Sequence, residues 1–165
     1  MFIFFFVTLS VKCYGAYSPE ISGHKVVVKE FGTYKLATKK QVYSTPNTTA
    51  GYTSKVETAE LIMQDHKLKL EKGTIFGVRI EIQGGYPGEV ISFKVKYEHP
   101  PITKPNGTIS RGFTQNKRVK FKETAADYGA LYSLTEDYEL VPGTWVFSII
   151  SDGTIVVRKE FELVE

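Results

Sequence analysis

The chain has 165 residues, of which 42% are hydrophobic and 24% charged, with a formal net charge of +3 at pH 7. These values are close to those of ordinary globular domains, so they exclude collagen-like and low-complexity chains and leave no room for two large domains. Apart from one denser cluster at Lys117, Arg118, Lys120 and Lys122, the basic residues are spread along the chain, and we expect no binding of nucleic acid.

The first predicted element is a secretory signal peptide at residues 1–15. Residues 1–11 are almost all apolar, which suits the core of a signal peptide and is too short for a membrane-spanning helix of about 20 residues. Cys13 and Gly15 place small residues two apart, as signal peptidase requires, so cleavage after Gly15 leaves Ala16 as the mature N-terminus. No basic residue precedes the apolar run, and an uncleaved anchor is the alternative.

Cleavage determines which chemistry the mature chain retains. Cys13 is the only cysteine, so the mature chain has no disulfide, no thiolate metal site and no cysteine nucleophile. We expect residues 16–165 to form a single domain that is exported, periplasmic or secreted, without stable membrane insertion. A domain of about 150 residues buries roughly 68–70% of its unfolded surface, which is sufficient without disulfides.

Beyond residue 20, alternation of apolar and polar residues is the main signal, and it is typical of strands. Residues 25–34 are one candidate strand. Residues 55–63 fit a strand or a short helix, and we favour the strand because its neighbours are strands. Residues 76–82 and 91–97 alternate clearly. Because glycines and a proline at residues 84–88 separate these two runs, we predict an antiparallel hairpin with one buried face.

A second hairpin is predicted at the C-terminus. Residues 145–150 are apolar on both faces, as in a central strand, and we expect Trp145 to be buried between two sheets. Asp152-Gly153 favours a tight two-residue turn. In the return strand, residues 155–163, Lys159 interrupts the apolar row, which indicates a bulge or a position near the sheet edge.

Residues 116–121 and 129–138 are two further candidate strands. No segment has the pattern of a three-turn amphipathic helix. With about seven or eight strands separated by turn residues, the sequence predicts an all-β protein, an antiparallel two-sheet sandwich.

Three short motifs add a family resemblance. They are Gly73-Thr74-Ile75-Phe76-Gly77, His99-Pro100-Pro101, and the run Glu-Leu-Val-Pro-Gly-Thr-Trp-Val-Phe at residues 139–147. Together they resemble a bacterial family of small, usually exported proteins that is known only as a domain of unknown function. The resemblance covers about residues 26–164 and implies an immunoglobulin-like topology. It implies no functional residues.

The residues with catalytic potential do not form a known pattern. His24, His66 and His99 lack metal-ligand spacing, and we expect His99 to be a loop histidine satisfied by water or backbone. No serine-nucleophile motif is present. Carboxylate pairs such as Glu136 and Asp137, or Glu123 near Asp127, are expected to be solvated loop charges. We therefore expect a protein that is not an enzyme and has no metal or cofactor.

Two functions remain open. The first is a non-catalytic β-sandwich that binds a protein partner or has an accessory role in the cell envelope. The alternative is a carbohydrate-binding module, because exposed tyrosine rings stack on sugars. The tyrosines expected in or beside loops are Tyr17, Tyr43, Tyr52, Tyr86 and Tyr128.

Loop length suggests where recognition takes place. The longest stretches expected to be irregular are residues 44–53 and 100–116, and long loops in compact domains are often functional. The second lies at the other end of strand 91–97 from the turn at residues 84–88. We predict that recognition is concentrated in this second loop. Its candidate residues are Pro100, Pro101, Pro105, Asn106 and Arg111.

Overall fold

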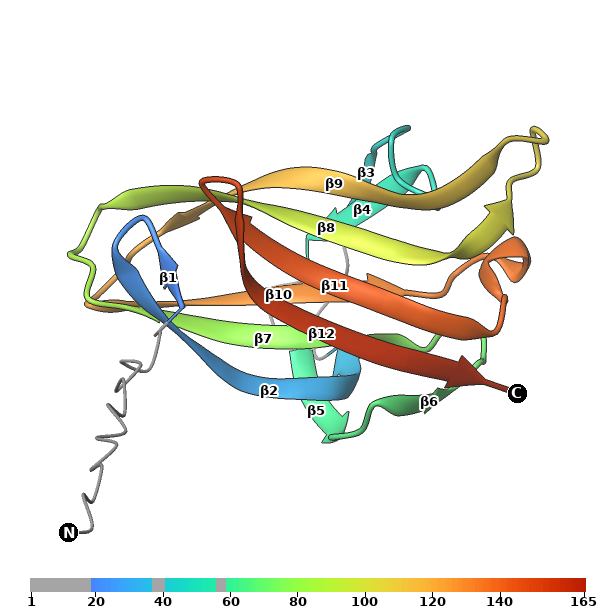
Figure 1. The fold of residues 1–165 in the computed structure, drawn as a ribbon, viewed down its shortest axis with the longest axis horizontal. Helices are drawn as coiled ribbons and strands as arrows, with labels where there is room; N and C mark the ends of the chain where they lie inside the picture. Colours follow the sequence, from blue (N-terminus) through green and yellow to red (C-terminus); the bar gives the residue numbers. More distant parts are fainter. Residues whose placement is uncertain (1–18, 37–40, 56–58) are drawn as a thin grey trace, which may run out of the picture.

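The computed structural model describes residues 19–36, 41–55 and 59–165, which form two β-sheets packed face to face (Figure 1). The first sheet has the order β1-β2-β7-β10, and β5 pairs with the far end of β2. Its strands are β1 (Glu20–Ile21), β2 (His24–Leu36), β5 (Ala59–Met63), β7 (Ile75–Gln83) and β10 (Ala125–Ser133). The predicted signal peptide, residues 1–15, lies outside the described residues.

The second sheet has the order β6-β12-β11-β8-β9. Its strands are β6 (Lys67–Lys69), β8 (Val90–Thr103), β9 (Ile109–Lys120), β11 (Gly143–Ser151) and β12 (Thr154–Val164). All of its pairings are antiparallel except β6 with the end of β12. A separate hairpin consists of β3 (Gln41–Ser44) and β4 (Tyr52–Lys55).

The predicted all-β sandwich is confirmed, with more strands than the seven or eight expected. The described part of the chain contains one helix, the single 3₁₀ turn η1 (Asp137–Glu139). Residues 55–63 contribute a strand, as favoured, over Ala59–Met63, whereas the strand expected at residues 129–138 begins earlier and ends at Ser133. No described helix is long and apolar enough to cross a membrane.

The predicted hairpin of residues 76–82 with 91–97 is wrong. Both runs are strands with one buried face, as the alternation indicated, but β7 pairs with β2 and β10, while β8 pairs with β9 and β11. The connection at residues 84–89 therefore crosses from one sheet to the other. Alternation identifies the buried face of a strand, but two strands can bury their apolar faces against each other across a core as well as side by side.

A second crossing, from β9 to β10, lies against the first. Gly84 and Gly85 donate backbone hydrogen bonds to Thr124 O, at 3.0 and 3.2 Å, and Gly88 N donates to Phe121 O at 2.9 Å. The fully buried Phe121 ring fills the space beneath Gly85, where an added Cβ would lie 2.4 Å from the ring. Gly85 is thus required by close packing.

The C-terminal hairpin is confirmed. Asp152 and Gly153 both have positive φ, 49° and 81°, as in a tight turn between β11 and β12. The bulge lies in β12 at Val156, because Ile149 pairs with Val157 and Ile150 with Ile155. The predicted bulge at Lys159 is therefore wrong. The alternative prediction, that Lys159 lies near the sheet edge, is correct, because β6 covers β12 only at Glu162–Val164.

The core between the sheets is rich in aromatic rings. Phe76 of the first sheet lies 5.5 Å from Trp145, 5.3 Å from Phe147 and 5.5 Å from Phe161 of the second sheet. Trp145 is fully buried, as predicted. These contacts arise because β7, β11 and β12 each place alternate apolar side chains toward the facing sheet.

Replacing Trp145 with Ala should lower the free energy of unfolding by about 3–5 kcal/mol, because it leaves a large cavity between the sheets. Urea unfolding followed by circular dichroism measures this change. Tyr86→Ala, at an aromatic ring that is 66% exposed, is the control and should shift stability by less than about 0.5 kcal/mol. Equal stabilities for the two variants would contradict the core position of Trp145.

Candidate functional site

The predicted recognition loop is in fact a β-arm. Residues 100–116 are not irregular, because β8 continues to Thr103 and β9 begins at Ile109, leaving a turn at residues 104–108. The ladder passes from Glu98↔Gly112 to Ile102↔Ser110, so three residues of β8 face one residue of β9. This bulge accommodates Pro100 and Pro101. Prolines have no backbone N–H to donate to the ladder, so within a sheet they are found at bulges or edges. The arm projects at the end of the sandwich (Figure 1).

The five candidate residues lie on this arm. Pro101, Pro105, Asn106 and Arg111 are exposed, whereas Pro100 is half-buried. Asn106 Oδ1 accepts hydrogen bonds from Thr108 N at 3.1 Å and Thr108 Oγ1 at 2.7 Å, so this side chain closes the turn. The structure thus brings the candidates together, while their role in binding stays a prediction.

The tip of the β3–β4 hairpin packs against the base of the arm. Thr48 and Thr49 are buried there. Thr49 Oγ1 lies 2.7 Å from His99 Nε2 and 3.0 Å from Ser110 Oγ, and Lys104 Nζ donates to Thr48 O at 2.9 Å. Segments about 50 residues apart in the chain are therefore joined by buried polar contacts.

His99 is buried at this junction and lies within β8, not in a loop. Its Nδ1 is 2.7 Å from Pro100 O, so Nδ1 carries the proton and Nε2 accepts from the Thr49 hydroxyl. The predicted backbone partner of His99 is confirmed, and Thr49 of the hairpin is a second partner. The ring lies 4.6 Å from that of Trp145. Burial lowers the pKa of His99, because a charged imidazole loses hydration there.

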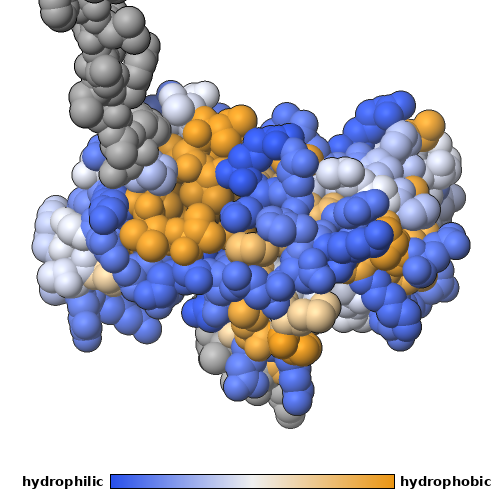
Figure 2. All heavy atoms as spheres, turned by 60° about the horizontal axis from the view of Figure 1, so that its bottom comes forward, coloured by the Kyte–Doolittle hydropathy of each residue, from blue (hydrophilic) through white to orange (hydrophobic). Residues whose placement is uncertain are grey.

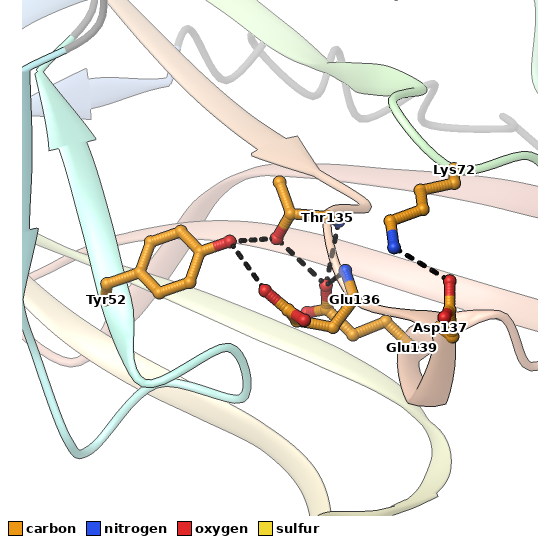
Figure 3. A network of polar contacts seen from close by, with 6 residues as sticks. All are labelled: Tyr52, Lys72, Thr135, Glu136, Asp137 and Glu139. Carbon is orange, nitrogen blue, oxygen red and sulfur yellow. Dashed lines mark hydrogen bonds and ion pairs between the residues drawn. The ribbon is translucent and has the colours of Figure 1, made fainter.

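A second buried polar group, Glu139, fixes the loop that follows β10 (Figure 3). Its carboxylate accepts hydrogen bonds from Thr135 N at 2.9 Å and Glu136 N at 3.0 Å, and from the hydroxyl groups of Tyr132 and Thr135. Burial raises the pKa of Tyr132, and the nearby Glu139 raises it further, so Tyr132 remains a donor. The buried carboxylate is thereby satisfied.

Two further contacts hold η1 in place. From β4, the Tyr52 hydroxyl donates to Thr135 Oγ1 and lies 3.3 Å from Glu136 Oε1, as Figure 3 shows. Lys72 Nζ pairs with Asp137 at 2.9 Å on the exposed side. Glu136 and Asp137, expected to be solvated loop charges, therefore each have a partner.

The imidazole and hydroxyl groups at this junction contact one another and the backbone. His99, Thr49 and Ser110 include the side chains of nucleophilic catalysis, but His99 Nδ1 faces a carbonyl instead of a carboxylate, and the imidazole is buried. Among the residues that the structure describes, no group of three or more His, Cys, Asp or Glu could hold a metal ion. These groups connect the β3–β4 hairpin to the arm and to the loop that carries η1.

The described loop tyrosines do not form a common binding surface. Tyr128 packs on Phe93 at 5.0 Å between the sheets, and Tyr52 contacts the η1 loop. Tyr43 and Tyr86 are exposed, but Tyr86 lies in the crossing at the opposite end of β8 from the arm. Tyr17 lies outside the described residues.

Sequence reasoning missed Glu139 and Thr49. Glu136 and Glu139 are three residues apart after Thr135, a spacing typical of a helix N-terminus whose acidic side chain returns to cap the first backbone amides. That signal was available for Glu139. None was available for Thr49, because its partners His99 and Ser110 are distant in the chain.

The buried His99 should make stability depend on pH. Its pKa is lowered in the folded state, whereas an unfolded histidine titrates near about 6.5. As pH falls below that value, the unfolded chain binds the proton first, so stability is lost. We expect the urea midpoint to fall between about pH 7.5 and pH 5, and this fall to be smaller in His99→Gln. An identical fall in both proteins would contradict the assignment.

Replacing Glu139 with Gln should lower the free energy of unfolding by about 2 kcal/mol or more, because a side-chain amide group then meets buried donors. Chemical denaturation of Glu139→Gln measures this effect. Asp137→Asn is the matched control at the exposed carboxylate of the same turn, with an expected change below about 0.5 kcal/mol. Equal effects would show that Glu139 has no special structural role.

Comparisons with known proteins agree with this architecture. An immunoglobulin-like protein from Pseudomonas aeruginosa is similar in structure, with a TM-score of 0.60 and 20% sequence identity over 85% of this chain and 97% of that chain. At this identity the likeness shows the fold alone, which is immunoglobulin-like, as expected. No curated protein sequence matches the chain. The model of a family described as a domain of unknown function (DUF3859) matches residues 24–163, and the chain belongs to this family.

Proposed function

We propose that this domain is a non-catalytic recognition module that binds a protein partner through the β8–β9 arm. The observation that supports it is the buried junction of Thr49, His99 and Ser110, which fixes the arm against the β3–β4 hairpin. A rigid base lowers the entropy lost when the exposed side chains of an arm bind.

The exposed side chains of the arm suit a protein surface. Ile109 is 62% exposed, and Arg111, two residues further along β9, lies on the same side of the strand. Pro101 and Pro105 add exposed apolar area with little conformational freedom. This combination fits a partner that offers an apolar depression with a carboxylate beside it, because arginine and buried apolar anchors contribute strongly to protein interfaces.

A location outside the cytoplasm, periplasmic or secreted, is part of this proposal. It rests on the features of a signal peptide in residues 1–15. An accessory role in the cell envelope fits that location. The carbohydrate-binding alternative has weaker support, because the described loop tyrosines do not share a surface on which a sugar chain would stack.

The test begins with a photo-crosslinking residue at position 109, which identifies the partner in cells. The partner is then purified and its affinity for variants measured by calorimetry. Ile109→Asp should weaken binding at least about tenfold. Ile62→Asp is the matched control, because Ile62 of β5 is 63% exposed and lies away from the arm, and it should bind as the wild type does. Unchanged affinity in Ile109→Asp would overturn the proposal.

A further inference from the structure

A group of basic side chains lies on the outer face of the second sheet, away from the arm. In β8, Ile91, Phe93 and Val95 are buried, so the alternate residues face outward. The ladder places Lys120 opposite Val90, Arg118 opposite Ser92 and Asn116 opposite Lys94. Cross-strand partners share a face, and Lys94, Arg118 and Lys120 therefore lie together.

These three cations are not neutralised by the protein. Lys94, Arg118 and Lys120 are exposed, and within the described ranges none of them forms an ion pair. Further along the same face the charges are paired, with Lys96–Glu98 at 2.8 Å and an Arg158–Glu160 contact. Three unpaired cations on one face raise the local positive potential, which favours an anionic ligand.

Exposed apolar side chains border the basic group. Ile150 pairs with Lys94 on one side and with Ile155 on the other, and Ile155 is 52% exposed. Val90 begins β8, and the largely exposed Tyr86 lies in the crossing just before it. Figure 2 shows a broad apolar area on the side of the molecule where β2 and β12 lie, with hydrophilic residues around it. The exposed apolar side chains that border the basic group itself are therefore Tyr86, Val90 and Ile155.

The start of the described chain lies at this same end. His24 Nε2 is 2.9 Å from Glu89 Oε1, and its ring is 5.3 Å from that of Phe121, so the start of β2 is attached to the crossing that carries Tyr86.

We propose that this amphipathic face, defined by Tyr86, Val90, Lys94, Arg118, Lys120 and Ile155, docks on the surface of a bilayer that contains anionic lipids. Basic residues are attracted to the negative surface potential, while tyrosine and small aliphatic side chains enter the headgroup region. The exposed apolar side chains beside the cations, Tyr86, Val90 and Ile155, favour a lipid surface over an acidic protein, because such side chains enter the headgroup region. The arm, at the other end of β8 and β9, then points away from the membrane.

The test measures how the mature chain, from Ala16 onward, binds vesicles of phosphatidylcholine with phosphatidylglycerol, by co-sedimentation. Each basic residue near such a surface contributes about a fivefold factor, so Lys94→Gln with Arg118→Gln should weaken binding at least tenfold. Lys35→Gln with Lys67→Gln removes two exposed lysines elsewhere in the sheets and should leave binding unchanged. Added salt should weaken binding of the wild type.

Tyr86→Ala tests the apolar contribution to vesicle binding. We expect this variant to bind more weakly than the wild type at low salt and at high salt. Vesicles of phosphatidylcholine alone should bind weakly. Equal binding to both vesicle types, unchanged binding in the Lys94/Arg118 variant, or binding to soluble polyglutamate without binding to vesicles would each overturn the proposal. Melting curves of all variants are compared first, and the substitutions are at exposed positions, so folding is expected to be retained.

Discussion

The contact between aromatic rings across the two sheets is the interaction on which the rest of the structure depends. Phe76 brings the first sheet against Trp145, Phe147 and Phe161 of the second. Neither sheet can bury its apolar face alone, and the stability of a domain without disulfides comes mainly from this burial. The arm, the hairpin and η1 lie at one end of the sandwich, so their positions depend on how the strands that carry these rings pack.

Trp145 also links the apolar core to the polar end of the sandwich. The centre of its ring lies 5.5 Å from that of Phe76, 4.6 Å from that of His99 and 4.8 Å from that of Tyr132. Beyond those rings, the polar atoms of Thr49 and Glu139 complete the hydrogen bonds that burial requires. The contacts at the base of the arm are therefore continuous with the core, because His99 packs on Trp145 and also meets Thr49.

The edges of the second sheet are poorly suited to pairing with a further strand. Lys117 of β9 and Lys159 of β12 lie opposite the buried Phe93 and Phe147, so both lysines face inward near an edge. Lys159 Nζ lies 4.0 Å from the centre of the Phe31 ring, and burial lowers the pKa of Lys117. Inward-facing charges oppose the addition of another strand, and the outer face and the arm remain available.

The sequence by itself determined the local features. Period-two alternation at residues 76–82 and 91–97 identified the strands and their buried faces, Asp152-Gly153 located the tight turn, and the apolar row of residues 145–149 placed Trp145 in the core. Each of these depends on neighbours within a few residues. Only the tertiary structure decided that β7 and β8 lie in different sheets, that residues 100–116 form an arm, and that Thr49 meets His99. Those outcomes depend on which distant surfaces bury one another, and local alternation carries no information about that choice.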